Sequence, residues 1–365
     1  MKEGTRKIAW FEPAFSDDDV RGVESTMLSG FVNEGPQVRA FEGALCRYFG
    51  VPFAVCTPSG TTALALALMA MGIGQGHSVL IPDLTFIGTA SAVRLAGAEP
   101  ILVDVNPTTF TIDIDDAGQQ IRGDTRAVIP VHLNGRSASW DDLREFGEKN
   151  GLFIIEDAAE AIGSRNDRGL LGTLGNAGCF SLAPTKIITS GQGGFVLTHN
   201  QDIRDNLIRL KDHGRLSRSS DLHSETGFNF KVTDLQGALA GTQFEKLDAR
   251  IRRNLEIDSK YRSGLAGVAG LTFPPRPPAG GYLMWPDITY GRRDDMVSAL
   301  RAKDIALRPF WPPIHTQPAY LSDRDFPGAS EAADRGCWLP SSPSISDSDI
   351  ECVVRSVVDW ARDNG

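Results

Sequence analysis

Apolar residues are distributed along the chain in two recurring patterns, and these patterns alternate. Short apolar runs, typical of buried strands, occur at residues 53–57, 79–82, 100–103, 127–131, 152–156 and 194–198. Helical patterns occur at residues 20–28, 37–49, 63–71, 87–95, 113–121, 140–150 and 202–211. In 37–49, for example, Phe41, Leu45 and Phe49 fall on one face, whereas 63–71 is apolar throughout. This alternation predicts an α/β fold with a largely parallel sheet covered by helices on both faces.

The C-terminal part of the chain has a different pattern. A long helical pattern at residues 234–251 is followed by the rigid, extended segment Pro274–Pro278. Beyond that segment, the expected elements are a strand at 282–290, a helix at 294–303 and a last amphipathic helix at 350–360. We therefore predict a large domain over residues 1–250, which includes an N-terminal lead-in, and a smaller C-terminal domain over residues 251–365.

One lysine stands in an unusual local setting. Lys186 follows the mostly apolar stretch Gly178–Thr185 and precedes the glycine-rich stretch Gly191–Gly194. Lysine is rarely buried unless its amine is paired or chemically used, and a desolvated amine that has lost its proton can attack a carbonyl. Taken by itself, this stretch fits a surface lysine in a loop equally well.

A carboxylate upstream favours a chemical role for this lysine over a position on the surface. The apolar strand pattern at Ile154–Ile155 ends in Glu156 and Asp157. A carboxylate at the C-terminal end of a strand in an α/β sheet faces the ligand crevice. A lysine that forms a Schiff base and an acid that keeps the pyridine nitrogen protonated are what a protein contributes to pyridoxal phosphate (PLP) chemistry. The pair therefore makes PLP the candidate cofactor.

Several other residues are open to two interpretations. Ser59–Thr62, at an expected helix start, offers free N–H groups to a phosphate, but as an isolated motif it is better explained as an ordinary N-cap. Phe86 lies just past a strand end, where it either stacks on a flat cofactor or packs in the core. His315 and Arg308 share an aromatic loop, although a lone histidine is more often structural. The arginines at 250, 252 and 253 are interpreted as a solvated helix face.

Composition narrows the class of protein. The 365 residues are 41% hydrophobic and 23% charged, which is ordinary for a globular protein, and no apolar run approaches the ~20 residues that span a bilayer. A net charge of −9 argues against broad binding to nucleic acid or membranes. Residues 1–10 are polar and lack the apolar core of a signal peptide. The five cysteines form no C-x-x-C pair, so we expect free thiols in a reducing cytoplasm and no metal site.

The motifs also resemble those of a known family when they are taken together. They are Ser59–Leu64, Pro82-x-x-Thr85-Phe86, Val131-His132-Leu133-x-Gly135, Ile155–Glu160, Cys179–Ser181 with Lys186 and Gly193–Gly194, Gly227–Phe230, His315-x-x-Pro318-x-Tyr320 and Leu339–Ser341 with Pro343. Their order, from about residue 30 to the C-terminus, is similar to that in the DegT/DnrJ/EryC1/StrS sugar aminotransferases. The resemblance implies PLP-dependent transferase fold type I, as in aspartate aminotransferase. It is nearest to enzymes that aminate C4 of a nucleotide-linked 4-keto-6-deoxy sugar for surface polysaccharide or glycoside biosynthesis.

The resemblance also implies roles for individual residues. Lys186 would hold PLP covalently and move protons, and Asp157 would pair with the pyridine nitrogen. Glu160, expected one helical turn after Asp157, would lie near the phenolic oxygen, and Phe86 would stack on the ring. Glutamate would be the amino donor.

Other implied roles concern the phosphate, the substrate and a second subunit. Gly60, Thr61 and Ser181 would hold the phosphate of the cofactor. Asn229 would reach this phosphate from the partner subunit, which makes the active unit a homodimer with a shared active site. His315 and Arg308 would lie near the sugar or its diphosphate.

The chain departs from the family pattern at five positions, which are Asn134, Asn176, Leu182, Pro184 and Gln192. None of these removes a catalytic role, but they weaken assignment to one substrate. Relatives that dehydrate the sugar have histidine in place of the lysine, so Lys186 favours amino transfer. Alternative functions are another fold type I enzyme (an amino-acid aminotransferase, a lyase or a desulfurase) and a catalytically idle PLP-binding regulator.

Overall fold

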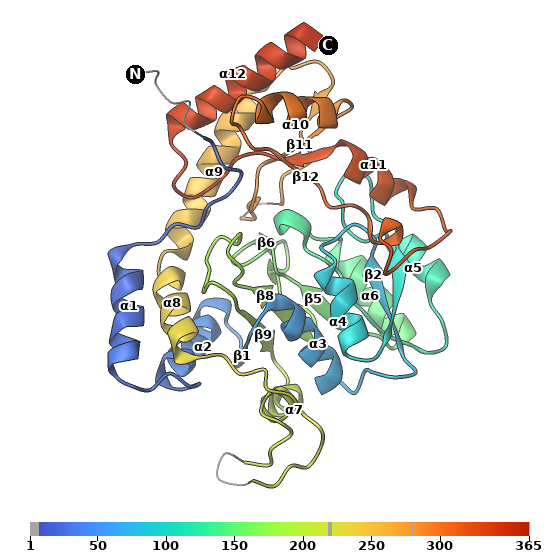
Figure 1. Ribbon diagram of the computed structural model, residues 1–365. Coiled ribbons are helices and arrows are strands. Elements are labelled where there is room, and N and C mark those ends of the chain that lie inside the picture. The colour runs from blue at the N-terminus through green and yellow to red at the C-terminus, as the bar shows by residue number, and fades with distance from the viewer. Residues whose placement is uncertain (1–6, 218–220, 279, 365) are drawn as a thin grey trace.

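The structure is a computed structural model that describes residues 7–217, 221–278 and 280–364 (Figure 1). Its large sheet has seven strands in the order β1–β9–β8–β5–β4–β2–β3. The strands are β1 Phe53–Thr57, β2 Ser78–Pro82, β3 Glu99–Val103, β4 Thr125–Val128, β5 Phe153–Asp157, β8 Ala177–Ser181 and β9 Gly194–Thr198. Strand β9 runs antiparallel to β8 and β1, and the remaining neighbours pair in parallel. The predicted mixed, mostly parallel sheet is therefore confirmed.

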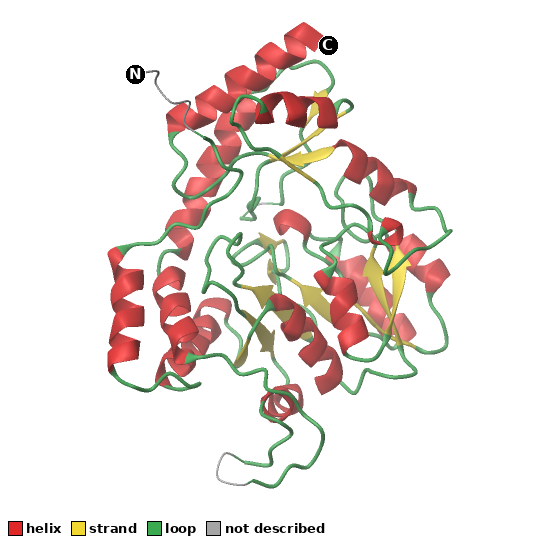
Figure 2. Ribbon diagram, in the orientation of Figure 1, coloured by secondary structure: helices red, strands yellow, loops and turns green. Residues whose placement is uncertain are grey.

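Helices cover both faces of this sheet, as the pattern predicted (Figure 2). The helices of this part are α1 Asp17–Leu28, α2 Pro36–Phe49, α3 Gly60–Ala70, α4 Gly88–Leu95, α5 Ile114–Gln120, α6 Trp140–Asn150, α7 Gln201–Lys211 and α8 Asp234–Phe244. Along β8, Cys179 packs in one apolar cluster with α3 and α7, and its neighbour Phe180 packs in another with Phe41 of α2. This alternation follows from the two-residue period of a strand.

A second, smaller sheet lies at the C-terminal end of the molecule. Its strands are antiparallel and have the order β10–β11–β13–β12. They are β10 Leu271–Thr272, β11 Asp287–Tyr290, β12 Arg308–Pro309 and β13 Gly336–Trp338. The helices around them are α9 Leu247–Gly264, α10 Arg293–Arg301, α11 Pro327–Arg335 and α12 Asp347–Asn364. The strands β6 Arg165–Asn166 and β7 Gly169–Leu170 form a separate two-stranded antiparallel hairpin.

Two predictions in this part of the chain are wrong. The expected helix 234–251 is two helices, because α8 ends at Phe244 and α9 begins at Leu247. The apolar period continues across the break and cannot reveal it. The expected strand 282–290 pairs only over Asp287–Tyr290, since the preceding segment is buried by side-chain contacts and not by a strand ladder. The predicted boundary between residues 250 and 251 falls inside α9, and the division into two domains stays a prediction.

In the described parts of the chain, no helix has both the length and the apolar character needed to cross a bilayer. All five cysteines are free thiols, as expected from their spacing.

Candidate active site

A cavity of about 260 Å³ opens where β5 and β8 end and α3 begins. Eight of the ten predicted site residues line this cavity. They are Gly60, Thr61, Phe86, Asp157, Glu160, Ser181, Lys186 and Arg308. The sequence places these residues far apart, and the parallel topology brings them together at one edge of the sheet, where ligand sites of α/β proteins form.

Lys186 lies in the turn that follows β8, with only 11% of its side chain exposed. Its Nζ atom is 3.3 Å from Oε1 of Glu160 and 5.1 Å from the centre of the Trp285 indole ring. A carboxylate on one side and an aromatic face on the other both attract an ammonium group. These contacts hold the amine inside the cavity, and the alternative of a surface lysine is wrong.

Asp157 is the last residue of β5, and its carboxylate is buried. Thr89 Oγ donates a 2.8 Å hydrogen bond to Oδ2, and the backbone N–H of Ala159 donates to Oδ1 at 3.1 Å. Burial raises the pKa of Asp157 above its usual range, while these hydrogen bonds and the charge of Lys186 act in the opposite direction. A cation placed against this carboxylate would therefore relieve an electrostatic cost.

Glu160 lies in a hydrogen-bonded turn. The prediction that it follows Asp157 by one turn of a helix is therefore wrong. Its Oε2 accepts a 3.0 Å hydrogen bond from the backbone N–H of Asn134, and Oε1 faces Lys186. Burial raises the pKa of Glu160, and the positive charge of Lys186 lowers it. Two buried acids thus lie within reach of the charge of one amine, one at the end of β5 and the other in the turn that follows it.

The start of α3 forms a seat for an anion. Ser59 caps the helix by accepting from the N–H of Thr62 at 3.1 Å. Among the described residues, no acceptor pairs with the N–H groups of Gly60 and Thr61, which belong to the first turn and point out of the helix. A Cβ atom at Gly60 would lie 2.9 Å from Cβ of Ser181, so glycine lets the helix end approach β8 closely. Free N–H groups with a hydroxyl beside them suit a phosphate.

The opposite wall of the cavity is aromatic. Phe86 is 53% exposed, and its ring lies 5.7 Å from that of Trp311. The Arg308 guanidinium lies 4.8 Å from the centre of the Trp10 ring, and both residues line the cavity. This wall offers flat apolar surface together with one cation.

A buried polar cluster behind the lysine contains residues that the sequence did not assign to the site. The Asn134 side chain accepts from the N–H of Trp285 at 2.7 Å and donates to Asp287 at 2.9 Å. Asp287 in turn forms two hydrogen bonds of 2.6 and 2.7 Å with the Arg136 guanidinium. Asn134 has a φ of 54°, which asparagine tolerates better than most residues. The only sequence signal was the departure from the family pattern at Asn134.

Two predicted site residues lie outside the cavity lining of this chain. His315 donates its backbone N–H to Asp83 at 2.7 Å, pairs with the same carboxylate through Nδ1, and stacks on Phe326. Asn229 is exposed and forms an isolated antiparallel β-bridge with Asp212, directly after α7. The assigned role of each residue stays a prediction.

The donor set fits PLP. A buried acid suits a protonated ring nitrogen, a nearby amine suits the aldehyde, and unpaired N–H groups at a helix start suit the phosphate. The exposed ring of Phe86 provides a surface on which a pyridine could stack.

Comparison with known proteins identifies the group to which this site belongs. Residues 13–358 match the model of the DegT/DnrJ/EryC1/StrS aminotransferase family. The chain belongs to this family. The resemblance drawn from the motifs is thus confirmed, as are fold type I and PLP-dependent aminotransferase activity, with PLP as the cofactor.

Relatives of this DegT/DnrJ/EryC1/StrS protein include sugar-modifying enzymes. A GDP-perosamine synthase of Caulobacter vibrioides is 34% identical over 87% of this chain and 88% of its own. A GDP-perosamine synthase of Escherichia coli O157:H7 is 30% identical over 98% of this chain and 99% of its own. Among solved structures, S. venezuelae DesV in complex with a ketimine intermediate is 31% identical, with a TM-score of 0.90 over 94% of both chains.

Proposed function

We propose that this aminotransferase moves an amino group from glutamate to a nucleotide-linked 4-keto-6-deoxy sugar, giving a 4-amino sugar for surface polysaccharide or glycoside biosynthesis. The observation that carries the proposal is one cavity in which Lys186 and Asp157 face an aromatic wall with a cation, Arg308. The likeness to two GDP-perosamine synthases supports a nucleotide sugar as the acceptor. Such a substrate brings a sugar ring and an anionic diphosphate, which match the aromatic surface and Arg308.

The residues that would hold the cofactor follow from the donor set. Gly60, Thr61 and Ser181 would take the phosphate, and Phe86 would pack on the ring. Asp157 pairs with the ring nitrogen, for which its buried and hydrogen-bonded carboxylate is suited. Glu160 would lie near the phenolic oxygen, and its contact with the amine would orient Lys186.

When bound, PLP supplies an electron sink that stabilises negative charge on the carbon next to the transferred nitrogen. Lys186 would hold the cofactor covalently in the resting protein, and its amine would be free to act as a base once the donor is bound. Its freed amine accepts the proton from the α carbon of glutamate, and Glu160 keeps that amine directed into the cavity. Asp157 holds the proton at the ring nitrogen. The same groups act in reverse order on the keto sugar, with Arg308 binding its anionic part.

We further propose that the protein acts as a cytoplasmic homodimer in which Asn229 completes the phosphate site of the partner subunit. The exposed position of Asn229, outside the cavity lining of its own chain, supports this role. His315 is proposed to act near the sugar from its position beside Asp83.

A panel of acceptors tests the proposed reaction. The purified protein with PLP and glutamate is offered nucleotide-linked 4-keto-6-deoxy sugars, 3-keto sugars, sugars without a keto group, and 2-oxo acids. The expected result is an amino sugar in amounts equal to the 2-oxoglutarate formed, detected by mass spectrometry, with the 4-keto sugars only. Transfer to 2-oxo acids alone would identify an amino-acid aminotransferase. Loss of amine without an aminated acceptor would identify a lyase, and no turnover despite bound PLP would favour an idle regulator.

A further inference from the structure

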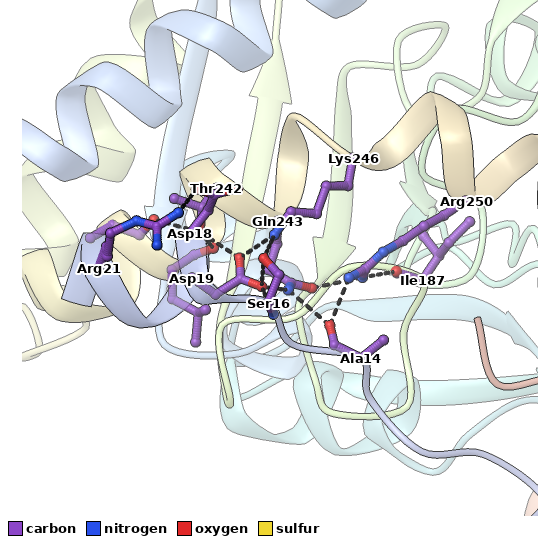
Figure 3. A network of polar contacts seen from close by, with 12 residues as sticks. Ala14, Ser16, Asp18, Asp19, Arg21, Ile187, Thr242, Gln243, Lys246 and Arg250 are labelled. Atoms are coloured by element: carbon purple, nitrogen blue, oxygen red, sulfur yellow. Dashed lines mark hydrogen bonds and ion pairs between the residues drawn. The ribbon is translucent and has the colours of Figure 1, made fainter. Parts of the chain in front are cut away.

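Arg250 is buried, although its arginine-rich stretch was interpreted as a solvated helix face. Only 9% of the residue is exposed, whereas Arg252 on the same helix is exposed. The Arg250 guanidinium donates to three oxygen atoms at 2.7 Å each (Figure 3). These are the backbone oxygens of Ala14 and Ile187 and the side-chain oxygen of Gln243. Arg250 therefore joins three parts of the chain. They are the N-terminal segment at Ala14, the turn at residues 183–191 that carries Lys186 (the lysine turn), and α8.

Ile187 directly follows Lys186 in the chain, so this contact acts on the backbone that carries the amine. The turn lacks regular secondary structure and is closed by a few internal hydrogen bonds, from Lys186 N–H to Ala183 O at 3.0 Å and from Ser190 N–H to Leu182 O at 3.1 Å. Arg250 fixes the turn from outside through a charged donor, and such hydrogen bonds are stronger than neutral ones.

Burying the Arg250 guanidinium carries an electrostatic cost. Among the described residues, no carboxylate lies within ion-pair distance of the guanidinium, whose partners are all neutral oxygens. Burial lowers the pKa of Arg250 below its usual value, and the charge of Asp19 acts in the opposite direction. An apolar side chain would fill the space without that electrostatic cost.

The contact is oriented by a second polar group, Asp19 of α1. The carboxylate of Asp19 accepts from Nε2 of Gln243 at 2.8 Å, and Nε2 also donates to Ala14 O at 3.1 Å. With its NH₂ group committed to these two acceptors, Gln243 must turn its oxygen toward Arg250. Lys246 and Thr242 hold the other carboxylate oxygen of Asp19 at 2.8 and 2.7 Å. The start of α1 and the lysine turn are thereby parts of one network (Figure 3).

We propose that Arg250 is a positioning residue for the amine of Lys186, and that the Ala14–Asp19 segment is its second anchor. The inference rests on the proposed role of Lys186. Arg250 acts through the carbonyl of Ile187 and is not among the residues that line the cavity.

The test compares Arg250→Met with Arg252→Ala, which removes an exposed guanidinium from the same helix. Hydrogen–deuterium exchange of the holoenzyme is followed on peptides covering residues 183–191, and kcat and KM for the amino donor are measured separately. For Arg250→Met, we expect exchange in the turn to accelerate and kcat to fall, each by about tenfold, as for the loss of one charged hydrogen bond. KM should change little. Arg250→Lys, which keeps the charge but cannot reach three acceptors, should give intermediate values.

A chemical rescue separates positioning from folding. Arg250→Ala leaves space for a guanidinium, so added methylguanidinium should restore part of kcat and slow the exchange of the turn, while adding nothing to wild type. Turn exchange and kcat in Arg250→Met equal to those of Arg252→Ala would overturn the inference, even if the melting temperature fell. The role of Lys186 is checked independently, because it fails only if Lys186→Ala still retains cofactor after borohydride reduction.

Discussion

The side-chain amide of Asn134 donates a 2.9 Å hydrogen bond to the carboxylate of Asp287, and this contact joins the 3-10 turn Leu133–Gly135 to β11 of the small sheet. The backbone N–H of the same asparagine donates to Glu160, which faces the amine of Lys186. Asn134 therefore links the position of the small C-terminal sheet to the position of Glu160 beside Lys186. The site is a property of both parts of the chain.

Asn134→Gly and Asn134→Ala should separate the backbone from the amide. Glycine accepts the φ of 54° and keeps the N–H to Glu160, whereas alanine adds backbone strain of roughly 1 kcal/mol. Both lose the amide, which leaves buried groups of Trp285 and Asp287 short of a partner, at a cost of about 1–3 kcal/mol. Urea denaturation should therefore show both variants destabilised, and alanine more than glycine. Equal stability of wild type and Asn134→Gly would show that the amide contributes nothing.

Asp157→Asn should change the cofactor-free protein and the loaded protein in opposite directions. Because burial raises the pKa of Asp157, the folded chain binds this proton more tightly than the unfolded chain. The free energy of unfolding without PLP therefore falls as the pH rises past about 4, the pKa of an unfolded aspartate. An asparagine side chain has no such proton to lose, so the Asp157→Asn variant avoids this fall in the free energy of unfolding.

Differential scanning fluorimetry at pH 7.5 tests this expectation. Cofactor-free Asp157→Asn should melt at or above the wild-type temperature, and the gain in melting temperature on adding PLP should be smaller than for wild type. Thr89→Val, which removes a hydrogen bond to the same carboxylate, serves as the matched control and should destabilise the loaded form without removing the charge. A wild-type gain in Asp157→Asn would argue against pairing of this acid with the ring nitrogen.

Lys186→Ala should abolish covalent attachment of the cofactor. Borohydride reduction followed by peptide mass spectrometry should find PLP on Lys186 in wild type and on no residue of the variant. Turnover should fall by more than the ~10²–10⁴-fold assigned to a general base, since the covalent role is lost as well. Lys149→Ala, a change at an exposed lysine of α6, should behave as wild type.

The strand and helix order of the large sheet could be predicted because its elements have strong apolar periods. The break between α8 and α9 could not, since leucine and phenylalanine continue the period through Phe244 and Leu247. What ends α8 there is not visible in the periodicity, although the side chain of Lys246, in the break, bonds to Asp19 more than 200 residues away. Contacts of this range leave no local signal.

The same reasoning explains which site residues were found. Lys186, Asp157 and the start of α3 lie at strand or helix ends, where sequence pattern and topology together place them in a crevice. Trp285 and Arg250 were not assigned to the site, because an indole beneath an amine and an arginine beneath a turn are set by tertiary packing. An arginine in a charged helical run is usually solvated, and only its burial distinguishes this one.

Because of Asp19, the free energy of unfolding should depend on pH in the acidic range. Burial alone would raise its pKa, but hydrogen bonds from Lys246, Thr242, the Ser16 backbone and Gln243 outweigh it and lower the pKa to about 2. A lowered carboxyl pKa stabilises the fold above the unfolded value and is lost as the pH falls through the folded one. Between pH ~4 and ~2, wild type should therefore lose roughly 2 kcal/mol that Asp19→Asn never had. Denaturant titrations at several pH values should show the two stability curves converging toward pH 2, and a constant gap would contradict the assignment.

Mixing two inactive variants tests whether Asn229 serves the site of a partner subunit. Lys186→Ala removes the amine of its own cavity, whereas Asn229→Ala is expected to impair the phosphate seat of the other one. A mixed dimer would then hold one site with both changes and one site with neither. Random reassortment makes about half of all dimers mixed, so about a quarter of the wild-type sites should be intact.

The measurement is amino transfer after the two variants are unfolded together, refolded with PLP and compared with each variant refolded alone. Activity near a quarter of wild type in the mixture, with almost none in either separate sample, would place Lys186 and Asn229 of different chains in one site. If Asn229 acted within its own chain, every subunit in the mixture would carry one defect, and no activity would return. Asn200→Ala, which changes the N-cap of α7 and not the site, replaces Asn229→Ala in the control mixture. That mixture should retain the activity of its Lys186-containing subunits in full.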